Sequence, residues 1–173
     1  LTPFYGHNLQ HKILKLTPDY SAPKTTLEAK TDFEGEVLSP RTNIYLTSID
    51  NASGVKQIYY AYDDDKNKIY ESMISPGWIE EGEHTLHYFS KDNVENEEKE
   101  NSFKFFMDKS APIVEYEIIG DQHQSGTNSY ISASTKIKLK AEDNKAGVKE
   151  VYYSINGSKA TLYTEPFVID QNA

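Results

Sequence analysis

Apolar and polar residues alternate along most of the chain with a period of two, and no segment keeps the period of about 3.6 that is typical of a helix. Over residues 43–49, Ile44 and Leu46 share one side, whereas Tyr45 and Thr47 share the other. This pattern predicts a strand with one packed face and one solvent-facing face. Similar alternation predicts further strands over residues 56–62, 84–91 and 101–108.

Turn-forming residues separate these runs. Residues 50–54 (Asp-Asn-Ala-Ser-Gly), 63–67 (Asp-Asp-Asp-Lys-Asn) and 75–77 (Ser-Pro-Gly) are rich in the residue types that favour turns. Short alternating strands joined by regular turns indicate an all-β fold, and a β-sandwich in particular.

The chain also repeats itself. Residues 19–23 (Asp-Tyr-Ser-Ala-Pro) return as residues 108–112 (Asp-Lys-Ser-Ala-Pro), an offset of 108 − 19 = 89. Residues 44–60 return as residues 137–153, an offset of 137 − 44 = 93, and both copies hold Asp-Asn, Gly-Val-Lys and Tyr-Tyr. The second copy therefore carries four extra residues between the two matched blocks, and the chain contains a tandem repeat.

The repeat sets the predicted domain boundaries. Residues 1–20 are expected to be the end of a preceding unit and a linker, with a last strand at residues 12–19. Residues 21–109 form one complete unit, whose length of about 90 residues suits an immunoglobulin-like sandwich. Residues 110–173 form a second unit that lacks its last two strands, so its sheet edges would be open unless residues 12–19 cover them.

The first unit resembles the bacterial Ig-like (fibronectin-III-like) repeats that occur in tandem on surface and periplasmic proteins and as modules appended to glycoside hydrolases. The resemblance rests on Leu46-x-x-x-Asp50-Asn51-x-Ser53-Gly54-Val55, on Tyr59-Tyr60, and on Glu81-Gly82-x-His84-Thr85-Leu86-x-Tyr88. It implies tandem immunoglobulin-like β-sandwich domains, the second incomplete. It also implies that His84, at the position of the tyrosine corner of such sandwiches, hydrogen-bonds to backbone.

Composition excludes several classes of function. The sequence has 18 basic and 27 acidic residues, a formal net charge of −9, which argues against nucleic acid as a partner. No apolar run is long enough to span a membrane, so no membrane insertion of this segment is expected. The absence of cysteine excludes disulfides and thiolate sites. No catalytic motif is present, and we expect no enzymatic activity.

The Asp-Asn pairs are the polar groups of greatest interest. The strand order implied by the resemblance gathers one set at the start of the first unit and another at the junction between units. These are Asp19, Asp50, Asn51 and Asp92, and then Asp108, Asp143 and Asn144. One interpretation is that these side chains accept hydrogen bonds from nearby backbone in Asx turns. The other is a Ca²⁺ site, since Ca²⁺ takes six to eight oxygen ligands. No other cofactor is expected.

Four aromatic residues are candidates for ligand binding. Trp78 could stack on a sugar ring, or it could belong to the core, because it stands beside an isoleucine and leads into a strand. Tyr45, Tyr59 and Tyr152 could form a flat aromatic face for a glycan or a protein, or they could be cross-strand pairs.

The function that these features favour is structural. The chain is predicted to be a non-enzymatic Ig-like spacer of a bacterial cell-surface, outer-membrane-associated or periplasmic protein, with neighbouring domains of the same chain as its partners. The alternative is an accessory module that binds carbohydrate or a protein, for instance one appended to a glycoside hydrolase. Pro23 and Pro112 restrict the residue before them to extended conformations, which would limit bending between units.

Overall fold

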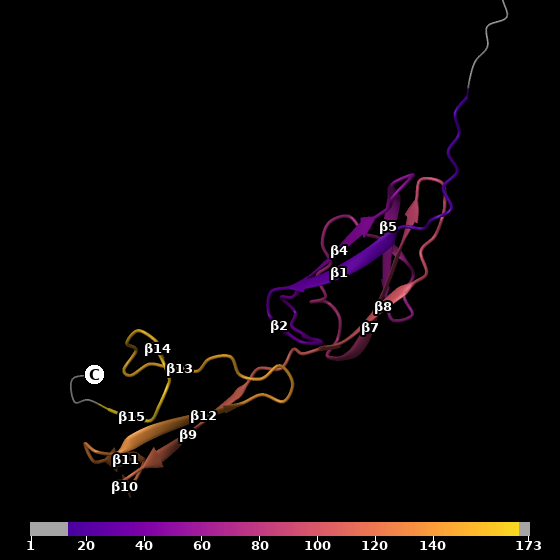
Figure 1. Cartoon of the computed structure of the whole chain (residues 1–173). Coiled ribbons are helices and arrows are strands. Elements are labelled where there is room, and N and C mark those ends of the chain that lie inside the picture. The colour runs from indigo at the N-terminus through magenta and orange to yellow at the C-terminus, as the bar shows by residue number, and fades with distance from the viewer. Residues whose placement is uncertain (1–13, 170–173) are drawn as a thin grey trace, which may run out of the picture.

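The computed structural model describes residues 14–169, and all of its regular elements are strands. Figure 1 shows two units that follow one another along the molecule, β1 to β8 in the first and β9 to β15 in the second. The predicted all-β class is therefore confirmed. The described residues contain no helix that could cross a membrane.

The first unit consists of two sheets. One pairs β1 (Lys24–Lys30) with β4 (Asn43–Ile49), and a single bridge joins Ile44 of β4 to Ile74. The other has six strands in the order β2-β3-β8-β7-β5-β6. Their bounds are β2 Phe33–Glu34, β3 Val37–Leu38, β5 Val55–Tyr62, β6 Lys68–Ile69, β7 Gly82–Asp92 and β8 Asn101–Met107.

The core of the first unit lies between these two sheets. Ile44 and Leu46 of β4 pack in one buried cluster with Leu86 of β7 and Phe105 and Met107 of β8. Because strand residues alternate between faces, the predicted inward rows of these strands are the rows that meet here. The first unit is accordingly a sandwich-like arrangement with an apolar centre.

The second unit repeats the sheet pairing of the first. Its sheet has the order β15-β12-β9, and two further pairs of strands join β10 to β11 and β13 to β14. The bounds are β9 Ile113–Ile119, β10 Gln122–Ser125, β11 Asn128–Ile131, β12 Lys136–Glu142, β13 Tyr152–Tyr153, β14 Thr161–Leu162 and β15 Phe167–Val168.

The two units agree residue by residue in their strand register. Leu27 pairs with Leu46 in the first unit, and Tyr116 pairs with Leu139 in the second, at offsets of 116 − 27 = 89 and 139 − 46 = 93. Three further pairs recur, and both residues of each pair are offset by 93. Tyr59 with Ile69 returns as Tyr152 with Leu162, and Tyr60 with Lys68 returns as Tyr153 with Thr161. The bridge of Ile44 with Ile74 returns as the pair of Ile137 with Phe167. The sequence repeat is therefore also a repeat of backbone pairing.

The four extra residues of the second unit lie in one hairpin. In the first unit, Phe33 pairs with Leu38 across a short turn between β2 and β3. In the second unit the equivalent residues, Gln122 and Ile131, pair at the base of the longer hairpin formed by β10 and β11. The insertion thus lengthens a hairpin and leaves the register of β9 and β12 unchanged.

The second unit differs from the first in burial. No apolar side chain among the described residues after Met107 is fully buried, and Thr135 is the one fully buried side chain of β9 to β15 and their connections. Ile113 and Tyr116 are each 71% exposed. The described second unit therefore has sheets and turns but no apolar centre comparable to that of the first.

Most strand predictions are confirmed within a few residues. The predicted 43–49 coincides with β4, and the predicted 56–62, 84–91 and 101–108 correspond to β5, β7 and β8. The predicted strand at residues 12–19 is wrong over its described part, residues 14–19, which form no strand and do not cover the second unit. Leu14 and Leu16 are exposed there, because no sheet lies beside this segment to cover its side chains. Residues 1–13 and 170–173 lie outside the described part of the chain.

Candidate functional site

The carboxylate of Asp19 ties the linker to the first unit. Its Oδ1 accepts hydrogen bonds from Ser21 N at 3.0 Å and Ser21 Oγ at 2.8 Å, and its Oδ2 accepts one from Ser53 N at 2.9 Å. These bonds, those from Ser21 first, hold the pKa of Asp19 well below its usual range because they stabilise the charged form. The linker and the loop between β4 and β5 are thereby joined through one ionised side chain.

Asp50 organises the loop between β4 and β5. Its Oδ2 accepts hydrogen bonds from Ala52 N at 2.9 Å and Gly54 N at 2.8 Å, which is the predicted Asx turn. Gly54 adopts a φ of +84°, a left-handed conformation that favours glycine. The other carboxylate oxygen, Oδ1, is buried and has no hydrogen-bond partner among the described residues. Asp50 Oδ2 therefore accepts the hydrogen bonds of the turn, and Oδ1 has no hydrogen-bond partner among the described residues.

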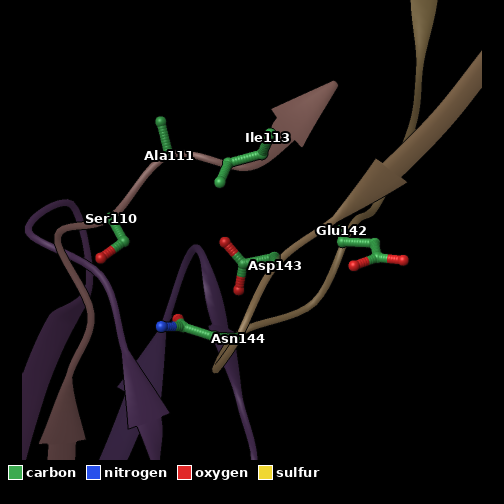
Figure 2. Close-up of a pocket in the computed structure, with 6 residues that line it drawn as sticks. All are labelled: Ser110, Ala111, Ile113, Glu142, Asp143 and Asn144. Atoms are coloured by element: carbon green, nitrogen blue, oxygen red, sulfur yellow. The ribbon is translucent and has the colours of Figure 1, made fainter. Parts of the chain in front are cut away.

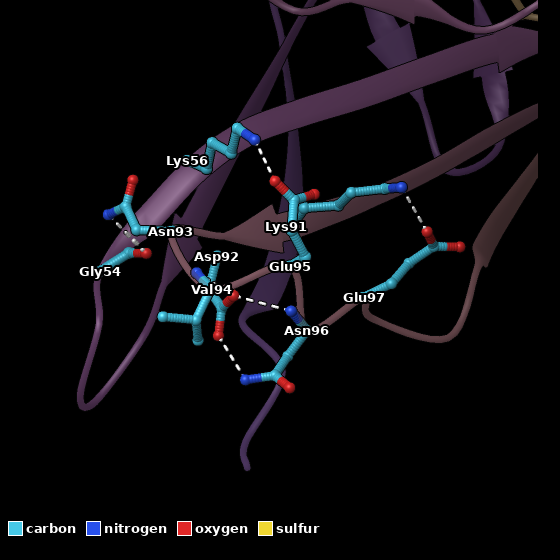
Figure 3. Close-up of polar contacts among 9 residues, drawn as sticks. All are labelled: Gly54, Lys56, Lys91, Asp92, Asn93, Val94, Glu95, Asn96 and Glu97. Atoms are coloured by element: carbon cyan, nitrogen blue, oxygen red, sulfur yellow. Dashed lines mark hydrogen bonds and ion pairs between the residues drawn. The ribbon is translucent and has the colours of Figure 1, made fainter. Parts of the chain in front are cut away.

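Asp92 organises the loop between β7 and β8 and is itself fully buried. Its Oδ1 accepts hydrogen bonds from Val94 N at 2.9 Å and Asn96 N at 2.7 Å, and its Oδ2 accepts one from Asn96 Nδ2 at 2.7 Å (Figure 3). Burial works against ionisation of Asp92, but the hydrogen bonds from Asn96 and Val94 outweigh it and lower the pKa. Asp92 is thus a charged group held inside its own turn.

These three aspartates converge at one end of the first unit. Asp19, Asp50 and Asp92, here called the Asp19 cluster, each offer a carboxylate oxygen within 4.8 Å of the others. The geometry fits a hard cation, which prefers carboxylate oxygens, and Asp50 also keeps one carboxylate oxygen, Oδ1, without a hydrogen-bond partner among the described residues. Three like charges this close repel one another, and a cation would relieve that repulsion.

Two neighbouring polar residues, the predicted Asn51 and the acidic Glu95, are engaged elsewhere. Asn51 Oδ1 accepts a hydrogen bond from Ser21 Oγ at 2.9 Å, so it supports the linker. Glu95 forms an ion pair with Lys56 instead (Figure 3).

The junction between the two units repeats the contacts of Asp19. Asp108 Oδ1 accepts a hydrogen bond from Ser110 N at 3.0 Å, and its Oδ2 accepts one from Ala146 N at 3.0 Å. Asp143 Oδ1 accepts hydrogen bonds from Lys145 N at 3.0 Å and Gly147 N at 2.9 Å, as Asp50 does in the first unit. The same linker carboxylate therefore meets the same loop of the following unit at both positions.

Further contacts join the units across this junction. Ser110 Oγ donates a hydrogen bond to Glu81 Oε1 at 3.0 Å, and Lys145 Nζ lies 4.2 Å from the centroid of the Phe106 ring. Asp108, the residue after β8, also donates its own N–H to Leu38 O at 2.8 Å. The first and second units are thus connected by hydrogen bonds and a cation–π contact as well as by the chain.

A shallow cavity of about 400 Å³ opens beside the junction. Figure 2 shows the Asp143 carboxylate directed toward the segment that carries Ser110, while the Glu142 carboxylate points away from it. Asn144 is exposed at the edge of this cavity. Within the described residues, no third acidic group joins Asp108 and Asp143 at cation-binding distance, so this junction is less complete than the Asp19 cluster.

His84 makes the backbone contact that the resemblance implies. Its Nε2 lies 3.0 Å from Glu80 O, and its Nδ1 lies 2.8 Å from Asp63 Oδ2. Both partners are acceptors, so both bonds form together only when the imidazole carries two protons. Burial opposes ionisation of Asp63, but the bonds from His84 and from Thr85 N–H outweigh it and lower the pKa.

The aromatic candidates lie apart from one another. Trp78 is 58% exposed, so its interpretation as a core residue is wrong, whereas the neighbouring Ile79 is buried. Tyr45 belongs to the sheet of β4, and Tyr59 belongs to the other sheet, where it stacks on its cross-strand partner Phe89 at 5.2 Å. Tyr152 lies in the second unit and donates a hydrogen bond to Glu150. The three tyrosines therefore form no common face.

Sequence reasoning missed residues that complete the Asp19 cluster. Ser21 and Ser53 donate to Asp19, and Asn96 closes the turn of Asp92. The recurrence of serine two residues after the linker aspartate in both copies is a signal that could have identified Ser21. Asn96 has no such signal, because the equivalent position of the second copy lies beyond residue 173.

Comparison of the chain with known proteins found no matching family model, no matching curated protein and no matching solved structure.

Proposed function

We propose that this chain is a non-enzymatic spacer built from repeated Ig-like sandwich units, as part of a bacterial cell-surface or periplasmic protein. Its partners would be the neighbouring domains of the same chain. The observation that carries the proposal is the repeated linker contact, in which Asp19 and Asp108 each accept a backbone hydrogen bond from the loop of the following unit. A spacer needs a fixed angle between its units. The linker aspartate and the loop of the following unit meet at the short linker, which determines this angle.

The physical reason is the strength of the contact. Hydrogen bonds to an ionised acceptor are about twice as strong as bonds between neutral groups. The extended residue before Pro112 removes further freedom from the linker. Ser110 with Glu81 and Lys145 with Phe106 then restrain the junction at two more points. Several restraints around one short linker favour a stiff connection over a flexible tether.

The experiment measures the spread of distances between the units. Since the chain lacks cysteine, single cysteines introduced at the exposed Lys99 and Lys159 would carry spin labels for pulsed electron resonance. A narrow distance distribution is expected for the parent chain and a broader one for Asp108→Ala. The matched control, Asp121→Ala, changes an exposed aspartate of the second unit and should leave the distribution narrow. A parent distribution as broad as that of Asp108→Ala would contradict the proposal.

A second candidate function is calcium-dependent stiffening at the Asp19 cluster. It is favoured by the unpaired and buried Asp50 Oδ1, which faces no hydrogen-bond donor although two other carboxylates lie within 4.8 Å. Asp19, Asp50 and Asp92 would supply the ligands, and the bound ion would supply positive charge between the linker and two loops. The further alternative of an accessory module that binds carbohydrate depends on Trp78, the exposed tryptophan of the first unit.

A further inference from the structure

A pocket lies around Trp78 in the first unit. It has a volume of about 540 Å³, and its walls come from the end of β5, the turn after it and the segment that precedes β7. Its lining includes Tyr62, Asp64, Asp65, Trp78, Glu80 and His84, here called the Trp78 pocket. Aromatic and acidic side chains thus share one concave surface.

The ring of Trp78 already attracts a cation. More than half of its surface is exposed, and one edge contact with Tyr62, at 5.5 Å between centroids and an interplanar angle of 84°, holds the ring in place. Lys68 Nζ lies 4.8 Å from the ring centroid. A positive group over the face of tryptophan is attracted by the negative face of the ring, and tryptophan is the best of the aromatic residues for this contact.

The pocket also carries unbalanced negative charge. Asp63 is engaged by His84 and Thr85, and Asp65 Oδ2 lies 3.7 Å from Lys68 Nζ. Asp64 and Glu80, by contrast, have side chains without an ion pair or hydrogen bond to any residue that the structure describes. Two free carboxylates beside an exposed indole favour a positively charged ligand and disfavour an anionic one.

Tyr62, one of the residues that line the pocket, has a buried hydroxyl without a partner among the described residues. Tyr62 is 3% exposed, and its Oη has no hydrogen-bond partner in the described part of the chain. Buried polar groups are nearly always hydrogen-bonded, so an unpaired one calls for an explanation. Because this oxygen is enclosed by its neighbours, Tyr62 serves the pocket through its ring, which supports the indole of Trp78.

We propose that the Trp78 pocket binds the guanidinium group of an arginine presented by a partner protein. The planar cation would stack on Trp78, and Asp64 and Glu80 would balance its charge. Arginine suits the site better than lysine, because its flat guanidinium stacks on aromatic rings and its several N–H groups can donate to more than one carboxylate. This inference is independent of the spacer role.

Fluorescence reports on the site directly, since Trp78 is the one tryptophan of the sequence. The whole chain would be titrated with N-acetyl-arginine amide, with its neutral isostere N-acetyl-citrulline amide, and with maltotriose as a neutral sugar. A saturable change is expected with the arginine compound alone, and added salt should weaken it. No saturable change with that compound, an equal affinity for the citrulline compound, or a response to maltotriose alone would overturn the proposal.

Three variants separate the site from nonspecific attraction to an acidic protein. Asp64→Asn combined with Glu80→Gln should weaken binding of the arginine compound at least about fivefold, whereas Glu165→Gln, an exposed acid of the second unit, should leave it unchanged. Lys68→Gln removes the resident cation from the Trp78 ring and should tighten binding. Equal weakening by the Glu165 variant, or no effect of the double variant, would contradict the assignment.

Discussion

Thr25 Oγ1 donates a hydrogen bond to Glu98 Oε2 at 2.6 Å, and this contact joins the first strand of one sheet to the loop that connects two strands of the other. Glu98 Oε1 also accepts from Thr25 N at 2.9 Å and Asn101 Nδ2 at 2.9 Å, while Oε2 accepts from Ser90. Thr25 and Ser90 are both buried. One carboxylate thus accepts hydrogen bonds from several buried or partly buried donors.

Replacement of Glu98 by alanine is expected to lower the free energy of unfolding by about 2 kcal/mol, because buried donors would lose their acceptor. Urea denaturation of the parent and the variant measures the difference. The neighbouring Glu97→Ala is the control: Glu97 forms an exposed ion pair with Lys91, and its loss should cost less than about 1 kcal/mol. Equal effects of the two substitutions would show that the buried network contributes little.

Stability should fall in acid. The pKa values of Asp19, Asp63, Asp92 and Glu98 are all lowered in the folded chain. A lowered folded pKa adds stability above the unfolded pKa, which is about 4 for these groups, and that stability is lost as the pH falls through the folded pKa. The urea midpoint is therefore expected to stay nearly level from about pH 7 to pH 5 and to fall below about pH 4. A midpoint that rises on acidification would contradict this.

Calcium should raise the melting temperature if the Asp19 cluster binds it. A ligand that binds only the folded state stabilises that state, and each kcal/mol raises the melting temperature of a domain of this size by about 4–8 °C. The melt would be recorded in calcium and in chelator. Asp50→Asn should abolish the shift, and Asp143→Asn, which changes the equivalent turn of the second unit, should keep it. Identical melting temperatures in calcium and in chelator would contradict the proposal that the Asp19 cluster binds calcium.

The second unit should open more readily than the first. The strands β9 and β12 have no fully buried apolar side chain, whereas β7 and β8 hold Leu86 and Met107 at 0% exposure. Amide hydrogen exchange of the whole chain is expected to be at least about tenfold faster in β9 and β12 than in β7 and β8, because little apolar surface opposes their local unfolding. Equal protection of the two units would mean that the exposed apolar side chains of the second unit are covered in solution.

Removal of the unpaired hydroxyl of Tyr62 should not destabilise the chain. Its oxygen is buried without a partner, so Tyr62→Phe is expected to leave the free energy of unfolding unchanged or to raise it by about 1 kcal/mol. The control is Tyr70→Phe, since Tyr70 donates its hydroxyl to Ser72 O and should lose that bond. Urea denaturation of both variants measures these changes. A marked decrease in the free energy of unfolding of Tyr62→Phe would mean that the Tyr62 hydroxyl has a partner in solution.

Alternation was enough to locate β4, β5, β7 and β8, because a sheet with one buried face forces apolar residues such as Ile44 and Leu46 to recur at every second position. It did not locate β1, β2, β3 or β6. It was not enough for residues 12–19. Leu14 and Leu16 have the same pattern, but a strand also needs a neighbour to pair with, and no pattern within a segment reveals whether that neighbour exists.

The Asp19 cluster was predictable through the strand order that the resemblance implies, because that order brings the loops after β4 and β7 to the same side of a sandwich. The exposure of Trp78 was not, since the turn that holds it follows no alternation, and an apolar residue beside Ile79 has the same sequence character whether it is packed or not. The unpaired oxygens of Asp50 and Tyr62 depend on side-chain placement, which a sequence does not record.

The longer hairpin formed by β10 and β11 has a practical consequence. Because its four extra residues leave every strand pairing in the neighbouring sheet unchanged, natural variation in length is tolerated at this tip. A sequence search for further repeats should therefore allow insertions at this turn, because a template of fixed length would miss repeats with a longer hairpin. An epitope tag inserted between Gly126 and Thr127 would, for the same reason, extend into solvent without changing the pairing of β9 with β12.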